Sequence, residues 1–394
     1  MTLIAAACGS DGEGGDTDTT TASIDVSPSA PAATDATSPQ ALDQATVDAA
    51  AAAFLEGQAA QGVTAFYIAV SDPNGGGDVV AAYGDASVGG PAATVDDSFR
   101  IGSISKTFTA TIILQLVEEG KLALDDTVGD QLPALAADHP ELSGLTVEQL
   151  LAMKSGVADY LNLSDEVLPV IVDDPSTVWA PEALVAAGVN AGVTEPGTLG
   201  YSTTNYIILQ LMAESVTGST LQELIATNIA DPLGLDGTVL PPNDDTTLPS
   251  PATSGYIDGG CVDEVATSGA TVEPGTDTTD WNASYGQGGG GMTSTLPDLL
   301  TWSQSMVGSS LLDEATALGR LEVEVLPEGI PYGQGIMAIG PWIGHEGEAI
   351  GWEALAVQDA ESGVSVALAA NGCGGLFTGF LEVLETLYPE SLAE

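Results

Sequence analysis

The pattern of apolar and polar residues divides the chain into a polar start, strands near both ends and a helical middle. Residues 9–40 are rich in Thr, Ser, Asp, Pro and Gly, with few large apolar side chains, which predicts a flexible tether. The Ala-rich stretch that follows, from residue 41 to residue 62, predicts a helix. The apolar stretches TAFYIAVS (64–71) and DVVAAYG (78–84) flank the turn signal DPNGGG and predict a β-hairpin.

The rest of the chain changes from helical periodicity back to strand-like segments. Helices are expected at 104–119, 146–153, 204–217, 219–229, 296–307 and about 376–387, and strands at 332–339, 354–359 and 364–371. The glycine run GQGGGGM (286–292) predicts a loop. We therefore expect an α+β fold, in which an antiparallel β-sheet built from both chain ends is flanked by helices and carries an all-helical subdomain. A catalytic cleft would lie between these two parts.

The charge of the chain excludes some partners. Five Lys and Arg residues stand against 56 Asp and Glu residues in 394, which gives a formal net charge of −51. Nucleic acid is excluded as a partner because phosphate contacts need clustered basic residues. An anionic membrane surface should also repel the chain. The acid excess fits either adaptation to salty surroundings or an ordinary soluble acidic surface.

The first residues, MTLIAAACGSDGEGG, resemble the end of a bacterial lipoprotein signal, with Cys8 as the lipidated residue. Two features depart from such signals: Ala5 stands where Leu is usual, and no basic residue precedes the apolar run. The alternative is a chance Ala-Ala-Cys in a disordered tail. The first interpretation predicts an exported protein that meets the membrane only through a lipid anchor. In an exported protein, the remaining Cys261 and Cys373 could form a disulfide or be two separate buried residues.

Ser103 and Lys106 form the one Ser-x-x-Lys pair in the sequence, within FRIGSISKTF. Residues three apart share a helix face, so the two side chains would be neighbours. Ser103 would lie at the positive end of the helix dipole. A desolvated Lys106 favours its neutral form and could accept the hydroxyl proton. The alternative is an ordinary helix lysine kept for solubility.

Two later segments supply further candidates. Tyr201, in PGTLGYSTTNY, precedes a predicted helix and could relay a proton to a leaving group. In WIGHEGEAIGW, His345 lies at a strand-like position, and Gly347 would let a substrate approach the strand. The backbone N–H groups of Ser103 and Glu348 could then form an oxyanion hole.

These three elements in this order resemble the serine β-lactamase and DD-peptidase superfamily, in its class C β-lactamase-like and penicillin-binding esterase branch. The resemblance runs from about residue 45 to 390 and includes LTVEQLLAMKSGVADY (145–160) and ADPLGL (230–235). It implies that Ser103 is the acylated nucleophile, with Lys106 as its base partner. Tyr201 matches the tyrosine of the family's Tyr-x-Asn element, and His345 the first position of its Lys/His-Thr-Gly element. The expected domains are a lipoprotein-signal remnant (1–8), a disordered tether (9–40) and one serine hydrolase domain (41–394).

The chain departs from the family pattern at the expected substrate contacts. Thr203 stands where the family usually has Asn, and Asn205 comes two residues too late. Glu346 and Glu348 flank Gly347, where relatives hold a substrate carboxylate. Anionic substrates should therefore fit poorly, and neutral esters, amides or amine-bearing substrates better.

The expected function is an acyl-serine hydrolase of an ester or amide, of the esterase or D-amino-acid peptide or carboxypeptidase type. The alternatives are a true β-lactamase and a non-catalytic, lipid-anchored penicillin-binding or sensor module.

If a charged His345 contacts the substrate, activity should change near pH 6.5. No Cys/His cluster has zinc spacing, so neither a metal nor a cofactor is expected. The protein is expected to be a monomer with a small-molecule or peptide substrate.

Overall fold

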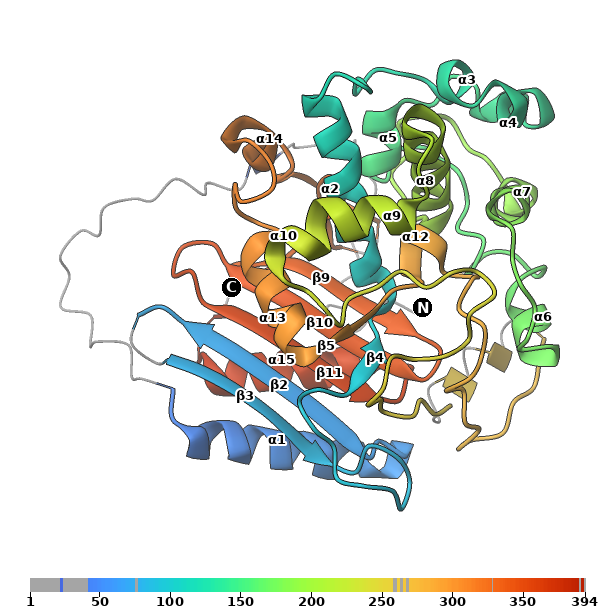
Figure 1. Ribbon diagram of the computed structural model, residues 1–394. Coiled ribbons are helices and arrows are strands. Elements are labelled where there is room, and N and C mark those ends of the chain that lie inside the picture. Colours follow the sequence, from blue (N-terminus) through green and yellow to red (C-terminus); the bar gives the residue numbers. More distant parts are fainter. Residues whose placement is uncertain are drawn as a thin grey trace, which may run out of the picture.

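The computed structural model describes residues 22–23, 42–74, 77–257, 261–262, 265–266, 269–327, 329–389 and 391–392. The proposed lipidation site, Cys8, and the predicted tether, apart from residues 22–23, lie outside these residues. Figure 1 shows a large sheet between two layers of helices. No helix among the described residues is long and apolar enough to cross a bilayer.

In the part of the chain that the structure describes, nine strands form an antiparallel sheet in the order β1-β6-β7-β8-β9-β10-β11-β2-β3. A separate pair, β4 and β5, forms a small second sheet. The strands are β1 (Ala22–Ser23), β2 (Ala65–Asp72), β3 (Gly77–Gly84), β4 (Ser98–Arg100), β5 (Thr293–Thr295), β6 (Glu322–Val325), β7 (Pro331–Tyr332), β8 (Met337–Ile339), β9 (Trp342–Ala349), β10 (Trp352–Asp359) and β11 (Ser365–Asn371). Strands from both ends of the chain thus meet where β11 pairs with β2, which confirms the predicted antiparallel α+β arrangement.

Helices fill the region between β4 and β5 and cover both faces of the large sheet. They are α1 (Gln44–Gln58), α2 (Ser105–Glu118), α3 (Val128–Gln131), α4 (Pro133–Asp138), α5 (Val147–Leu151), α6 (Leu168–Asp173), α7 (Pro181–Ala191), α8 (Thr203–Thr217), α9 (Leu221–Ile225), α10 (Asp231–Leu233), α12 (Gln287–Gly290), α13 (Leu296–Ser305), α14 (Glu314–Gly319) and α15 (Leu376–Leu387). Short 3-10 turns are η1 (Ala59–Gln61), η2 (Gly102–Ile104) and η3 (Pro140–Leu142), and η4 (Ala226–Ala230) is a π-helical turn.

The central strands β2, β9, β10 and β11 are buried along most of their length because helices cover both faces of the sheet. On one face, α1 and α15 pack through an aromatic cluster in which Phe54 stacks on Phe66 at 4.2 Å and on Phe380 at 5.4 Å between ring centroids. On the other face, α2, α8 and α13 enclose the larger core. The edge strand β3, which pairs with β2, is instead exposed or partly exposed except at Val79, which is buried.

Two predicted elements differ from the structure. The predicted strand 332–339 is divided into β7 and β8, because Gly335 has a φ of +74° that extended strands do not adopt. The glycine run predicted as a loop contains the short helix α12. Its glycines allow close packing: a Cβ on Gly289 would lie 2.6 Å from the Thr203 methyl group.

The turn that carries Ser103, η2, packs directly against the backbone of β9. A Cβ on Gly347 would lie 2.0 Å from the carbonyl oxygen of Ile101, and a Cβ on Gly102 would lie 2.3 Å from the carbonyl oxygen of Glu348. Gly102 also has a φ of +48°. Two glycines therefore allow the start of α2 to contact the strand without intervening side chains.

We predict that Gly347→Ala destabilises the protein by at least about 1–3 kcal/mol, because the added methyl group must push η2 away from β9. The measurement is the free energy of unfolding in urea. Gly57→Ala, in α1, is the matched control because its Cβ would meet no atom within 4 Å. That variant should be neutral or more stable. Equal stability of wild type and Gly347→Ala would contradict the close contact.

Candidate active site

Ser103 and Lys106 are adjacent at the start of α2, as their spacing predicts. Lys106 Nζ lies 2.9 Å from Ser103 Oγ. It also donates a hydrogen bond of 2.7 Å to the carbonyl oxygen of Gly289 in α12. The Lys106 side chain is fully buried. The sequence analysis did not identify the Gly289 carbonyl as a partner of Lys106. The feature of the sequence that could have indicated it is the glycine run, which lets α12 approach Lys106 closely.

Burial lowers the pKa of Lys106 to about 7, although the nearby carboxylates of Asp159 and Glu346 favour its charged form. Its hydrogen-bond partners are a hydroxyl and a carbonyl, neither of which carries a full charge. A large share of Lys106 is therefore neutral at pH 7, with a lone pair next to the Ser103 hydroxyl. This arrangement can deprotonate the serine.

Tyr201 lies beside both residues. The centre of its ring is 4.9 Å from Lys106 Nζ. Burial raises the pKa of the phenol well above its usual range, although its interaction with Ser103 acts in the opposite direction. The hydroxyl is buried and has no hydrogen-bond partner within the described part of the chain. At neutral pH, Tyr201 is thus a proton donor facing the serine, and Lys106 is the better base.

Thr203, at the first position of α8, is held by a carboxylate that the sequence analysis did not select. Its hydroxyl lies 3.2 Å from Asp159 Oδ2, which also accepts a hydrogen bond of 3.3 Å from the Asn162 amide. Thr203 and Asn162 both line the pocket next to Ser103. Asn205 faces elsewhere and binds Ser155 inside the core. Asn162 therefore supplies a side-chain amide near the position where the family's asparagine is replaced by Thr203.

His345 is close to these groups but is fully buried and does not line the pocket. Its Nδ1 contacts the carbonyl oxygen of Glu346, and its Nε2 lies 3.1 Å from the Tyr332 hydroxyl. Since a carbonyl can only accept, Nδ1 carries the proton and Nε2 accepts from Tyr332. Burial, with the nearby Lys106, lowers the pKa of His345 to about 3. The imidazole is therefore neutral at pH 7, so this geometry does not favour the charged His345 on which the predicted change near pH 6.5 depends.

Glu346 and Gly347 also differ from their expected roles, since neither lines the pocket. The space next to Gly347 is filled by Ile101 of the nucleophile turn, so the glycine admits protein backbone at this point. Glu346 is buried, and burial together with Glu348 raises the pKa of its carboxyl to about 8. Its negative charge is thus largely suppressed at neutral pH.

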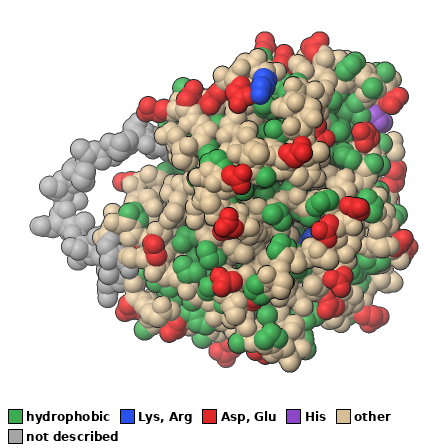
Figure 2. Space-filling model, viewed as in Figure 1, with side chains coloured by type: hydrophobic (Ala, Val, Ile, Leu, Met, Phe, Trp, Pro, Cys, Tyr) green, Lys and Arg blue, Asp and Glu red, His purple; other side chains and the backbone are tan. Residues whose placement is uncertain are grey.

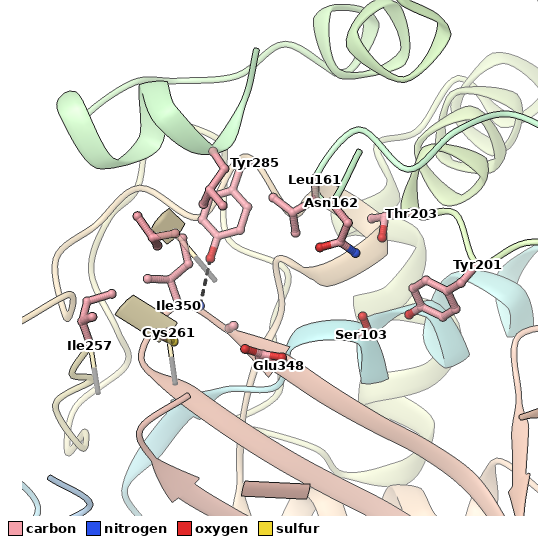
Figure 3. A pocket seen from close by; sticks show the side chains of 13 residues that line it. Ser103, Leu161, Asn162, Tyr201, Thr203, Ile257, Cys261, Tyr285, Glu348 and Ile350 are labelled. Atoms are coloured by element: carbon pink, nitrogen blue, oxygen red, sulfur yellow. Dashed lines mark hydrogen bonds between the residues drawn. The ribbon is translucent and has the colours of Figure 1, made fainter. Parts of the chain in front are cut away.

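The pocket beside Ser103 is mostly apolar, and Figure 3 shows Ser103 and Tyr201 toward one end of it and Ile257 and Cys261 toward the other. The described residues that line it are Ser103, Leu161, Asn162, Leu168, Tyr201, Thr203, Ile257, Cys261, Val265, Tyr285, Glu348, Ala349 and Ile350. The contact between Gly102 and Glu348 brings the backbone of Glu348 beside Ser103. The predicted oxyanion hole would use the amides of these two residues, Ser103 and Glu348.

One wall of the pocket is tied to the sheet by a disulfide between Cys261 and Cys373, whose Cα atoms are 5.5 Å apart. Of the two alternatives for these cysteines, the structure has the paired one. Ile257 and Ile350 pack around this bridge. Among the described residues, no group of three or more His, Cys, Asp or Glu could hold a metal ion.

Comparison with known proteins relates this geometry to a family. The family model described as Beta-lactamase matches residues 47–380. A crystal structure of a D-stereospecific amidohydrolase from Streptomyces sp. is 28% identical, with a TM-score of 0.73 over 86% of this chain and 98% of that one. A D-amino acid amidase from Ochrobactrum anthropi SV3, 22% identical with a TM-score of 0.71, shares the fold over 86% of this chain and 98% of its own.

Curated relatives match over part of their length. Penicillin-binding protein 4 of Amycolatopsis lactamdurans is 32% identical over 37% of this chain and 37% of its own. A D-aminopeptidase of Brucella anthropi is 29% identical over 72% of this chain, which spans about half (51%) of that relative. The family match over most of the sequence confirms the resemblance inferred from Ser103, Lys106 and Tyr201. This chain belongs to the Beta-lactamase family.

Proposed function

We propose that this protein is a serine hydrolase that cleaves an amide or ester bond in two steps, through an acyl group on Ser103. The observation that carries the proposal is the 2.9 Å contact between Ser103 Oγ and a fully buried Lys106. Burial favours the neutral amine, and only the neutral amine can take the serine proton. A lysine kept for solubility would instead be exposed.

In the first step, Ser103 Oγ attacks the substrate carbonyl carbon while its proton moves to Lys106 Nζ. The backbone amides of Ser103 and Glu348 would stabilise the oxyanion. Tyr201, whose pKa is raised by burial, gives its proton to the leaving amine or alcohol and regains one from Lys106. In the second step, water attacks the acyl-serine ester, the acid is released and Ser103 regains its proton.

The substrate class follows from the pocket and the relatives together. The apolar wall formed by Leu161, Ile257 and Ile350 suits an apolar side chain beside the reacting carbonyl. The similar D-stereospecific amidohydrolase and D-aminopeptidase act, by their names, on D-configured compounds. We therefore propose amides or esters of residues of D configuration with apolar side chains.

A true β-lactamase is less well supported, because penicillins carry a carboxylate. The described residues lining the pocket include no Lys or Arg to bind one, and they include Glu348. We expect turnover of nitrocefin to be slow relative to that of uncharged esters. Turnover of nitrocefin as fast as that of p-nitrophenyl butyrate would favour the β-lactamase instead.

We also propose that the protein is exported and anchored through a lipid on Cys8. The Cys261–Cys373 bridge supports an oxidising compartment, where disulfides persist.

We predict that Ser103→Ala lowers hydrolysis of p-nitrophenyl esters at least about 10³-fold, because the acyl group has no acceptor. Intact-mass spectrometry should detect a fluorophosphonate adduct on wild type and none on the variant. Ser105→Ala is the control, since this neighbouring hydroxyl is bound to the Gly102 carbonyl and not to Lys106. Wild type that neither turns over esters nor forms the adduct would identify a non-catalytic binding module.

We predict that kcat/KM rises with pH through a midpoint near 7, because Lys106, with a pKa lowered to about 7, must lose its proton before it can act as base. Well below the midpoint the rate should increase about tenfold per pH unit, and it should level off above about pH 8. Lys106→Met should be inactive across the range. Lys121→Met, which removes an exposed lysine, should keep the wild-type midpoint. A midpoint that is lost in His345→Gln would assign the titration to the histidine.

We predict that the full chain incorporates labelled palmitate in a bacterial host and that Cys8→Ser abolishes the label. Equal labelling of both proteins, or of neither, would contradict the anchor on Cys8.

A further inference from the structure

Asp159 is a buried carboxylate to which the proposed mechanism gives no role. Its side chain is 2% exposed. Oδ1 accepts a hydrogen bond of 2.8 Å from the backbone N–H of Leu161. Oδ2 accepts bonds of 3.3 Å from the side-chain amide of Asn162 and 3.2 Å from the Thr203 hydroxyl. Since each of these partners donates, the group acts as an acceptor, as a carboxylate does. One residue therefore holds three points of the pocket wall next to Ser103.

Thr203 connects this carboxylate to the surroundings of Lys106. The Thr203 hydroxyl binds Asp159, while its methyl group packs on α12, where a Cβ on Gly289 would come within 2.6 Å of it. The carbonyl oxygen of Gly289 accepts the 2.7 Å hydrogen bond from Lys106. Asp159 thus supports, through Thr203 and Gly289, the carbonyl that holds the amine.

The burial of Asp159 gives its charge an effect that surface carboxylates lack. Figure 2 shows acidic side chains distributed over the visible face, where water and salt screen them. Asp159 is shielded from water, so its field acts on Lys106 through the protein interior, where charges interact more strongly. Of the two carboxyl groups that favour the ammonium form of Lys106, Asp159 contributes more than Glu346.

The other titratable groups that face the Lys106 amine within the described part of the chain carry little charge at pH 7. They come from α8, the loop before it and β9, and are Tyr201, Tyr206, His345 and Glu346. Burial raises the pKa of both phenols far above 7 and lowers the pKa of His345 to about 3, so the three rings are neutral. Burial and Glu348 raise the pKa of the Glu346 carboxyl to about 8, so it is mostly protonated. Asp159 is therefore the main source of negative charge acting on the amine.

We propose that Asp159 is a positioning residue that sets the strength of Lys106 as a base. When Lys106 takes the proton of Ser103 it becomes an ammonium, and the buried charge of Asp159 stabilises this product of the transfer. Its hydrogen bonds also hold Thr203, and with it the Gly289 carbonyl that binds the same amine. The proposal rests on the hydrolase function proposed above and deepens it. Burial alone would make the amine neutral but a weak base, and Asp159 restores part of its affinity for the proton.

The test uses the full chain and two readouts: the pH profile of kcat/KM for p-nitrophenyl butyrate, and the ¹³C NMR titration of the Lys106 ε-carbon. Asp159→Asn keeps the size of the side chain and removes its charge. Without that charge the ammonium is less stable, so both midpoints should fall by about 0.5–1.5 pH units relative to wild type. The plateau of kcat/KM at high pH should also fall at least about tenfold, because a weaker base accepts the serine proton less readily.

Two control variants separate the charge from the structure. Asp159→Glu keeps the charge and should keep both midpoints within about 0.3 pH unit of wild type. Asp97→Asn removes a comparably buried carboxylate, 3% exposed, which binds the Tyr67 hydroxyl and the backbone N–H of Thr94 instead. It should leave both midpoints unchanged even where it lowers stability.

The outcomes distinguish this proposal from the hydrolase function. Unchanged midpoints in Asp159→Asn, with or without a loss of activity, would overturn the effect on Lys106 and leave Asp159 a role in holding the pocket wall only. An equal shift in Asp97→Asn would overturn it too. So would a fall of the midpoints in Asp159→Glu, which serves as the test where Asp159→Asn does not fold. If the NMR midpoint falls in Asp159→Asn but wild type shows no Ser103-dependent hydrolysis, the effect on Lys106 stands and the hydrolase function fails.

Discussion

The burial of Lys106 is the constraint on which the rest of the site depends. Removing an ammonium group from water is unfavourable unless it is paired with an opposite charge, and Lys106 is bound to a hydroxyl and a carbonyl. Because burial lowers its pKa to about 7, about half of the amine lacks its proton at pH 7, next to the serine that it can activate. The centre of the Tyr201 ring lies 4.9 Å from this fully buried amine. Burial of Lys106 thus disfavours its charged form and, for the same reason, allows the amine to take the proton of Ser103.

Glycines allow two backbone segments, η2 and α12, to pack closely around this buried lysine. Gly102 and Gly347 let the nucleophile turn lie directly on β9, and Gly289 lets α12 bring its carbonyl to Lys106. Side chains at these positions would separate backbone segments that have to touch. The site is therefore built largely from backbone contacts between segments that are far apart in the sequence. Its geometry should be more sensitive to added methyl groups than to changes of surface charge.

The chain has five basic residues, and each of them has an identified interaction partner in the structure. Arg100 and Arg320 are both buried and donate to backbone carbonyls, Arg100 to that of Trp281 and Arg320 to that of Met306. Lys121 and Lys154 pair with glutamates. Among the described residues this leaves no basic side chain in the pocket, which Glu348 also lines.

The sequence was sufficient for the parts of the site that depend on local spacing. Ser103 and Lys106 meet because residues three apart share a helix face, and the antiparallel sheet follows from strand patterns at both ends of the chain. Contacts set by tertiary packing were not predictable in this way. Examples are the Gly289 carbonyl on Lys106, the Asp159 carboxylate behind Thr203, and Tyr332 opposite His345. The pattern also misplaced the role of Gly347, because nothing local to β9 indicates that Ile101 packs against it.

The most direct test of this account is the pKa of Lys106 itself, which three lysines in 394 residues make measurable. Protein labelled with ¹³C at the lysine ε-carbons should give three NMR signals, one of which is absent in Lys106→Met. We expect that signal to titrate near pH 7, because burial lowers the pKa of Lys106 to about 7. A Lys106 signal that titrates near the ordinary lysine value of about 10.4 would contradict the central claim, because the amine would then be charged and unable to activate Ser103.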